Sequence, residues 1–226
     1  MRELDALIAD VHREALRAPF PIDEEVYRRA GRDPQAPILC AGSLDARVCV
    51  FARDLGKDEV THGQPLIGAG GRLVRAGLLR AVHGREPDPK DTTLFSALDH
   101  VLLTNTVPYK PPGNKAYSTA VKDRFRPFLV ELLTVHWRGD TVLTLGNEAF
   151  DWFVRHAAAG AAQALWDRED RYQGRLPCSL RSPDGSVVKE IAVLPLPHPS
   201  PLNARWYSRF PGLLDDRLKG LVAPRA

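Results

Sequence analysis

The stretch "DTVLTLGNEAFDWFVRHAAA", residues 140–159, decides the fold class of this chain. A short run of apolar and β-branched residues is followed by a glycine, and apolar residues then recur at helical spacing. This order predicts a strand, a tight turn and a helix in immediate succession. Such a unit is typical of proteins in which strands and helices alternate along the chain.

The same alternation extends outward from this stretch in both directions. Further strands are predicted at 46–52, at 100–109 and within 190–201. Further helices are predicted at 4–18, 71–83, 118–136 and 210–222. Strands that alternate with helices indicate a parallel sheet that is covered on both faces. We therefore expect an α/β protein, a three-layer α/β/α fold with a central, mostly parallel four-stranded sheet, in a single domain over 1–226.

One segment departs from this alternation. Residues 175–197 are expected to form a local hairpin, because Asp184 and Gly185 are a typical turn pair between two apolar runs. The segment 54–71, by contrast, is rich in glycine and is expected to be irregular.

Composition excludes several classes of protein. Hydrophobic residues make up 44% and charged residues 26% of the 226 residues, which is ordinary for a globular protein. No apolar run approaches the roughly 20 residues that span a bilayer, and charges throughout residues 1–16 argue against a signal peptide. The 3 cysteines have no CxxC spacing, which argues against a disulfide scaffold and a zinc site. We therefore expect a cytoplasmic protein with buried free thiols, no metal and no membrane partner.

The net charge is only +3, but the basic residues are unevenly distributed. They gather in 66–80, 105–126 and 198–226. If these segments converge, one face is strongly basic, which is typical of a protein that binds a polyanion; the alternative is a set of scattered, solvated charges. The basic residues concerned are Arg72, Arg75, Arg80, Lys110, Lys115, Lys122, Arg124, Arg126, Arg205, Arg209, Arg217, Lys219 and Arg225.

Three unusual loops follow predicted strands, at 53–71, 104–114 and 195–203. In an open parallel sheet, ligands bind outside the carboxyl ends of the strands. These loops should therefore meet at one edge of the sheet. They overlap the basic segments, which favours the interpretation that the charges converge.

The first loop, "GQPLIGAGGRLV", leads into a helix, and the free amides of a helix N-terminus can bind phosphate. It lacks the Lys-Ser/Thr of a P-loop, and Leu73 stands where the dinucleotide fingerprint needs a glycine. A mononucleotide-binding protein remains a weakly supported alternative. Asp54 and Glu59 lie in the same loop, either as candidate acids or as solvent-exposed side chains of a polar turn.

The other two loops carry candidate recognition residues. Asn105 follows a strand and could read both a donor and an acceptor on a base edge, or simply form a turn before Pro108. His198 stands between two prolines, and such a rigid frame can preorganise a catalytic group, although a structural histidine is the alternative. Leu202 could be buried, or could be a wedge that unstacks a DNA base step. Together these residues describe an enzyme that flips a base out of DNA.

These segments resemble the uracil-DNA glycosylase superfamily along most of the chain. "HPSPLNARW" is similar to the leucine-loop motif, and "LLTNTV" is similar to the motif that carries the uracil-reading Asn. "ARDLGKDEVTHGQPLIGAGGRLV" and "NTVPYKPPGNKAYSTAVKDRFRPFL" resemble two motifs of the thermostable, iron–sulfur branch, known as family 4. Four motifs in order at matching spacing are a specific signal.

The chain departs from that branch at the cluster. Tyr109 and Phe125 stand where the branch has two cysteines, and its amino-terminal cysteine pair is also missing. An iron–sulfur cluster needs thiolate ligands. We therefore expect a protein without a cluster, without any other cofactor and without colour, in which these aromatic rings fill the apolar space.

Three further departures concern the site. Asp54 aligns with the water-activating Asp of the best-known branch and Glu59 with a Glu of the iron–sulfur branch, so both are candidate acids and Asp54 is favoured. Leu66 replaces the Phe on which uracil stacks, and such stacking is worth roughly 1–3 kcal/mol. Gly56 stands where a Tyr rejects the methyl group of thymine.

The resemblance implies hydrolysis of an N-glycosidic bond in DNA that contains uracil or another deaminated base, by a monomer acting in base excision repair. Asp54 would orient water, His198 would donate a hydrogen bond to the departing uracil O2, and Asn105 would read its Watson–Crick edge. The remaining candidates for contact with the base are Gly56, Gln64, Pro65 and Leu66. The candidates for contact with DNA are Gly68, Gly70, Lys110, Asn114, Ser200, Pro201, Leu202 and Arg205.

Two alternatives stay open. The first is a non-catalytic member that binds damaged or single-stranded DNA, which the loss of the aromatic ring at Leu66 supports. The second is a mononucleotide hydrolase that uses the glycine-rich loop, although the sequence lacks the spacing of metal-binding carboxylates.

Overall fold

The computed structural model describes residues 3–91, 93–113, 115–200 and 203–222. Its six strands form one sheet in the order β1-β3-β2-β4-β6-β5. The four central strands β3, β2, β4 and β6 are parallel, and β1 and β5 pair antiparallel at the two edges. The strands are β1 (Cys40–Gly42), β2 (Val48–Ala52), β3 (Val101–Asn105), β4 (Thr141–Leu145), β5 (Leu176–Arg181) and β6 (Val188–Leu196).

The expected α/β fold is confirmed, but the strand count of four is too low. The four parallel strands are the ones that the sequence predicts, and the two edge strands extend them. Strand β1 was missed because three residues are too few to show any periodicity. Strand β5 is the first arm of the expected hairpin with β6, and Gly185 takes the left-handed conformation (φ 74°) in its turn.

The parallel strands are buried on both faces, which explains their continuous apolar sequence. In β2, Val48, Val50 and Ala52 pack on one side, and Cys49 and Phe51 pack on the other. This alternation follows the two-residue period of a strand. Two separate apolar cores therefore lie above and below one sheet.

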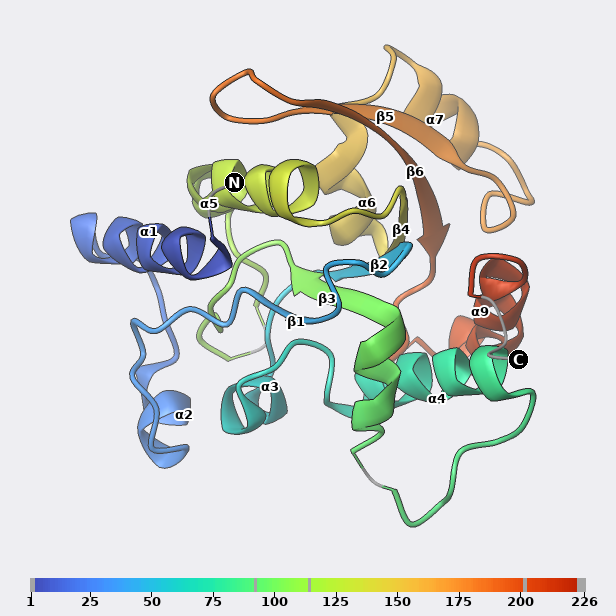
Figure 1. Ribbon diagram of the computed structural model, residues 1–226, viewed down its shortest axis with the longest axis horizontal. Helices are drawn as coiled ribbons and strands as arrows, with labels where there is room; N and C mark the ends of the chain where they lie inside the picture. The colour runs from blue at the N-terminus through green and yellow to red at the C-terminus, as the bar shows by residue number, and fades with distance from the viewer. Residues whose placement is uncertain (1–2, 92, 114, 201–202, 223–226) are drawn as a thin grey trace.

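Helices complete the outer layers (Figure 1). Helices α1, α5, α6 and α7 pack on the core that contains Phe51, and α4 and α9 pack on the core that contains Val50. The three-layer α/β/α arrangement is therefore confirmed. The helices are α1 (Leu4–Arg17), α2 (Glu24–Arg29), α3 (Lys57–His62), α4 (Ala69–His83), α5 (Thr119–Glu131), α6 (Asn147–Val154), α7 (Ala161–Trp166), α8 (Ala204–Tyr207) and α9 (Phe210–Leu218), with a 3-10 helix η1 (Phe95–His100) and a π-helix η2 (Leu132–His136).

The glycine-rich segment after β2 is more regular than expected, because it contains α3. The Glu59 side chain accepts a hydrogen bond from the backbone N–H of Gly56 (2.9 Å), which is the half of a capping box that a glycine N-cap allows at the start of this short helix. A Glu three residues after Gly56 was the signal in the sequence for the start of this helix.

Tyr109 and Phe125 lie in one buried aromatic cluster. Their ring centroids are 5.4 Å apart, and Phe20 contacts both, at 5.2 and 5.0 Å. The Tyr109 hydroxyl donates a hydrogen bond to the backbone carbonyl of Gln35 (2.9 Å). The two residues that occupy the aligned cysteine positions therefore contact each other and are packed as core.

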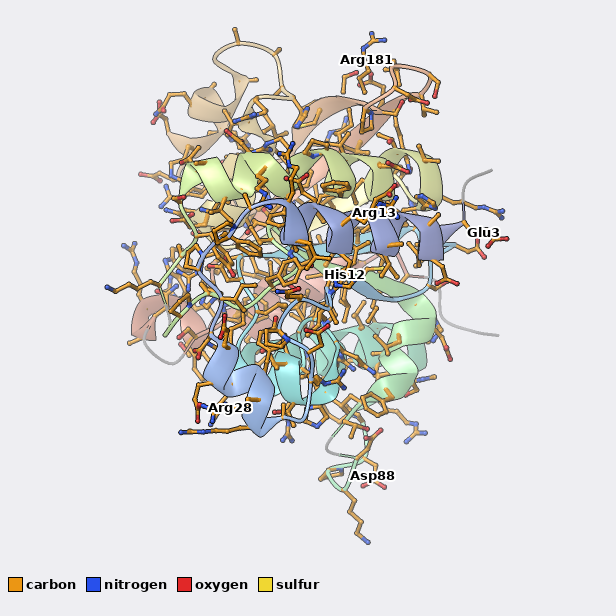
Figure 2. All side chains as sticks on the ribbon, turned by 90° about the vertical axis from the view of Figure 1, so that its left-hand side faces the viewer. Glu3, His12, Arg13, Arg28, Asp88 and Arg181 are labelled. Carbon is orange, nitrogen blue, oxygen red and sulfur yellow. The ribbon has the colours of Figure 1, made fainter. Side chains whose placement is uncertain are left out.

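Charged side chains project from the surface, as Arg28 of α2 and Arg181 of β5 do in Figure 2. No helix in the described part of the chain is both long enough and apolar enough to cross a membrane.

Candidate active site at the carboxyl ends of the parallel strands

Four parallel strands end at one edge of the sheet. Ala52 pairs with Asn105, and Leu145 pairs with Leu196, so the loops after β2, β3, β4 and β6 start side by side. The loops after β2, β3 and β6 surround a hollow of about 570 Å³. The side chains and glycines that line it include Arg53, Asp54, Gly56, His198, Ser200 and Asn203. Pro111 and Gly113 of the middle loop also line it, so the expectation that the three unusual loops meet at this edge is confirmed.

Asp54 is the buried charge of this hollow. Its side chain is only 4% exposed, and Arg53 Nε lies 3.0 Å from Asp54 Oδ2. No described side chain donates a well-aligned hydrogen bond to either carboxylate oxygen, and the backbone N–H of Tyr117 is a nearby donor that favours the ionised form. Burial therefore raises the pKa of Asp54 from 3.8 to about 6, although the positive charge of Arg53 opposes the rise. A carboxylate of this kind can accept a proton or hold a water molecule near neutral pH.

His198 stands at the exposed rim of the same hollow, held by glycines on both sides. A Cβ on Gly146 would lie 3.0 Å from His198 Cβ, and a Cβ on Gly70 would lie 2.9 Å from the Pro199 carbonyl oxygen. Burial of the ring against the protein, together with the charge of Arg53, lowers the pKa of His198. The imidazole is therefore neutral at pH 7 and can donate one hydrogen bond.

Glu59 binds backbone and has no free carboxylate oxygen. Its Oε2 accepts from Gly56 N–H (2.9 Å), and its Oε1 accepts from the N–H groups of Ile67 (3.0 Å) and Gly68 (2.9 Å). The carboxylate thus joins the start of α3 to the start of α4, where a negative charge is favourable. A Cβ on Gly56 would lie 2.6 Å from Glu59 Oε2, so the missing side chain at 56 is what admits this contact. These bonds give Glu59 a role in loop structure.

Arg75 organises the rest of the glycine-rich loop. It is fully buried and donates hydrogen bonds to the Leu66 carbonyl (2.9 Å), the Pro65 carbonyl (3.2 Å) and Gln64 Oε1 (3.3 Å). Leu66 takes a left-handed conformation (φ 54°), and its buried side chain joins the core below α4. The described lining of the hollow does not include Gln64, Pro65 or Leu66, so the structure does not bring these expected base contacts to Asp54.

Sequence reasoning missed this role of Arg75, because it counted the residue as a surface cation. The available signal was its position on the apolar face of a helix, one residue after Val74 and three before Leu78. A buried arginine needs acceptors, and the irregular loop beside it supplies backbone carbonyls.

Asn105 lies at the end of β3, beside the start of the Asp54 loop. Its side chain is buried, and no described residue donates to its Oδ1. A buried amide oxygen without a donor is costly, so a ligand that donates to it would be stabilised.

The basic face is smaller than the charge distribution suggests. Lys110 is a clear correction, because its ammonium is buried and donates to Asp23 Oδ2 (2.7 Å) and to the carbonyls of Pro111 and Gly113. Other basic side chains are held by carboxylates or carbonyls in the same way. They are Arg75, Arg80, Lys122, Arg124, Arg126, Arg217 and Lys219.

Four basic side chains of these segments form no hydrogen bond or ion pair with a described residue: Arg72, Lys115, Arg205 and Arg209. Two of them flank one aromatic ring, since the guanidinium carbons of Arg205 and Arg209 lie 5.2 and 5.8 Å from the ring centroid of Trp206. Trp206 in turn packs edge-on against Tyr172, at 4.9 Å. Exposed cations beside an aromatic ring suit a nucleic-acid strand.

A second, smaller hollow of about 230 Å³ adjoins the first. The two share Arg53, His198 and Asn203, and the second extends to Gly146 and Tyr172. Arg53 therefore lies between the hollows, and sequence reasoning did not single it out.

The remaining predicted DNA contacts lie either near the hollow or outside the described residues. Ser200 lines the first hollow, and Gly68 and Gly70 lie at the start of α4, next to Glu59 and Pro199. Asn114, Pro201 and Leu202 lie outside the described residues. In the described part of the chain, no three His, Cys, Asp or Glu side chains gather as metal ligands, and the three thiols are free.

The fold and the hollow together define a class of protein: an open α/β sheet that holds a buried carboxylate and a neutral imidazole at the carboxyl ends of its strands. That pair can polarise a bond and hold water for hydrolysis. The family model of the uracil DNA glycosylase superfamily matches residues 40–221, and the chain belongs to this superfamily. No curated protein matches the chain. Membership supports a DNA-glycosylase-like function in general, with DNA as the binding partner.

Proposed function

We propose that this protein is a monofunctional DNA glycosylase that flips uracil or a related deaminated base out of DNA and hydrolyses the N-glycosidic bond in base excision repair. The observation that carries the proposal is the buried Asp54 carboxylate, which shares one hollow with His198 in a chain of this superfamily. We also propose that the chain acts as one domain, as a monomer and in the cytoplasm.

In the proposed reaction, the bond between the sugar and the base breaks as the sugar gains oxocarbenium character. The ionised Asp54 stabilises this positive charge and orients the attacking water. When the base is uracil, the neutral His198 donates a hydrogen bond to O2 of the departing base, where negative charge develops. The lack of a well-aligned side-chain donor to Asp54 among the described residues supports this role, because water and the sugar can then be its partners.

Base recognition is assigned to Asn105, whose unpartnered Oδ1 accepts from an N–H of the flipped base. Gly56 leaves the hollow open where a larger side chain would exclude bulky bases. Leu66, Gln64 and Pro65 act indirectly, through the shape of the loop that Arg75 holds. We place the chain nearest the iron–sulfur branch, but with the aromatic pair Tyr109 and Phe125 in place of cluster ligands.

Contact with DNA is assigned to Ser200, Arg205 and the backbone at Gly68 and Gly70. Leu202 is retained as the wedge, and Pro201 and Asn114 are retained as DNA contacts, on the sequence alone.

A cleavage assay tests the proposal. The protein is incubated in excess with duplex and single-stranded oligonucleotides that each carry one uracil, hypoxanthine or xanthine, and alkali then cuts any abasic product. We expect cleavage of at least one of these, and none of the matched undamaged strand. Absence of cleavage from pH 5 to 9 on every substrate would refute the enzymatic proposal.

The second candidate is a non-catalytic protein that binds damaged or single-stranded DNA. It is favoured by Leu66, which is turned into the core and offers no aromatic ring to a flipped base. Salt-sensitive binding of the same oligonucleotides without cleavage would select this candidate.

A further inference from the structure

Arg53 is the only described residue that touches the Asp54 carboxylate and also lines both hollows. Its side chain is 34% exposed, so the guanidinium is neither a core group nor a free surface charge. We propose that Arg53 is a positioning residue for both members of the site: it keeps Asp54 ionised and directed into the hollow, and it keeps the His198 imidazole neutral. The catalytic part of this inference rests on the proposed function.

Three described groups besides Arg53 influence the ionisation of Asp54. Lys122 of α5 and Glu148 of α6 are both close enough to influence it, but they form an ion pair with each other. Their effects on Asp54 therefore largely cancel. The backbone N–H of Tyr117, in the loop before α5, also favours the ionised carboxylate, but it carries no net charge. Of the two described cations that act on Asp54, Arg53 is the one that forms an ion pair with its carboxylate.

The position of Arg53 also affects the orientation of the Asp54 carboxylate. The Nε atom lies 3.0 Å from Oδ2 but outside good hydrogen-bond alignment, so the contact is electrostatic and leaves both carboxylate oxygens able to accept. A neutral donor at this position would instead occupy one oxygen. Arg53 therefore supplies charge without using the lone pairs that water needs.

The same cation faces His198. Arg53 and His198 line both hollows together. Burial lowers the pKa of His198, and Arg53 is the one described charged group that lowers it further. Asp54 lies in the first hollow, and Glu148 and Tyr172 line the second, so these are the other titratable groups in the described lining around the imidazole. A cation beside the ring disfavours a second proton on it.

Removal of the Arg53 charge therefore raises the pKa of both Asp54 and His198. The carboxylate loses its stabilising cation and takes up a proton at higher pH. The imidazole loses its repelling cation and also takes up a proton at higher pH. Both changes remove the active protonation states at mildly acidic pH, so the acidic limb of the pH–rate profile moves upward.

The test compares wild type with R53Q, R53K and the control Arg47→Gln. Arg47 pairs with Asp140 and is 55% exposed, at the amino-terminal end of the sheet. One readout is the pH titration of the His198 ring, followed by NMR and assigned with His198→Gln. The other is single-turnover cleavage from pH 5 to 9. In R53Q we expect the midpoint of the His198 titration and the midpoint of the acidic limb of the cleavage profile each to rise by about one pH unit, as loss of a nearby charge predicts. We expect wild-type midpoints in R53K and Arg47→Gln.

Unchanged midpoints in R53Q would overturn the inference, and so would an R53K variant that behaves like R53Q. If R53Q does not fold, Arg53→Met keeps the aliphatic stem without the charge and is measured in its place. The NMR titration does not need catalysis. If wild type fails to cleave any substrate, the proposed function is refuted while the His198 midpoints still decide the role of Arg53.

Discussion

At the scale of one residue, the Asp54 carboxylate shows that a buried charge in a candidate active site can destabilise the folded chain. A pKa raised from 3.8 to about 6 corresponds to as much as about 3 kcal/mol of unfavourable free energy in the ionised form. The folded chain therefore binds a proton more tightly than the unfolded chain does. Its stability falls as the pH rises from about 4 through 6.

Asp54→Asn should separate activity from stability. It removes the charge, so single-turnover cleavage should fall by about 10²–10⁴-fold, the usual contribution of a positioned acid or base. The melting temperature at pH 7.5 should rise, and this gain should vanish at pH 4.5, where the wild-type residue is protonated. Thermal unfolding at the two pH values measures this. A variant that is less stable than wild type at pH 7.5 would contradict the burial argument.

Glu59→Gln should give the opposite pattern. Glutamine offers one carbonyl oxygen, whereas the native carboxylate accepts three backbone N–H groups through both oxygens. At least one buried donor is left unsatisfied, which costs about 1–3 kcal/mol. We expect a lower melting temperature and a smaller loss of cleavage than for Asp54→Asn. If Glu59→Gln is instead the more damaging to cleavage at equal stability, Glu59 is the working acid.

At the scale of elements, the proline loop after β6 depends on the glycine-rich start of α4. A Cβ on Gly70 would lie 2.9 Å from the Pro199 carbonyl oxygen and 3.1 Å from its ring. Two stiff elements thus meet where only a glycine fits. This contact fixes His198 relative to the sheet.

Gly70→Ala should therefore impair cleavage without unfolding the protein. Alanine favours a helix over glycine by about 1 kcal/mol, but the added methyl group pushes the Pro199 segment and His198 out of place. A shift of about 1 Å can cost roughly 10²-fold in rate. The matched control is Gly212→Ala in α9, where a Cβ meets no atom within 4 Å. Equal cleavage by the two variants would show that the contact does not position the loop.

At the scale of the whole molecule, the net charge of +3 is a poor guide to the DNA-binding surface. Most basic side chains of the three basic segments are used inside the protein, as Lys110 is by Asp23. The exposed pair on α8 and its flank, Arg205 and Arg209, remains available for phosphates.

The double variant Arg205→Gln/Arg209→Gln should weaken DNA binding and flatten its salt dependence. Each lost phosphate contact lowers the slope of log affinity against log salt by about one, so we expect a decrease of roughly two. Fluorescence anisotropy with an uncleavable oligonucleotide at several salt concentrations measures it. Arg181→Gln, an exposed residue at the far end of the hairpin, is the control (Figure 2). An unchanged slope would place the DNA elsewhere on the surface.

Much of this protein was predictable from sequence, because the deciding patterns are local. Apolar runs such as Val48–Ala52 and the helical spacing after Gly146 depend only on neighbouring residues, and they predict the parallel sheet and its covering helices. Parallel strands also oblige their carboxyl ends to share one edge, which is why Asp54, Asn105 and His198 could be predicted to gather there.

Tertiary structure alone decided what each polar side chain does. Arg75 and Lys110 are as basic as Arg205 in the sequence, yet the first two are buried against carbonyls and a carboxylate. Glu59 and Asp54 lie five residues apart, yet one is saturated by backbone amides and the other has no aligned side-chain donor among the described residues. These differences depend on partners distant in the chain, because burial makes an unpaired charge costly and only the folded arrangement determines which acceptors are within reach.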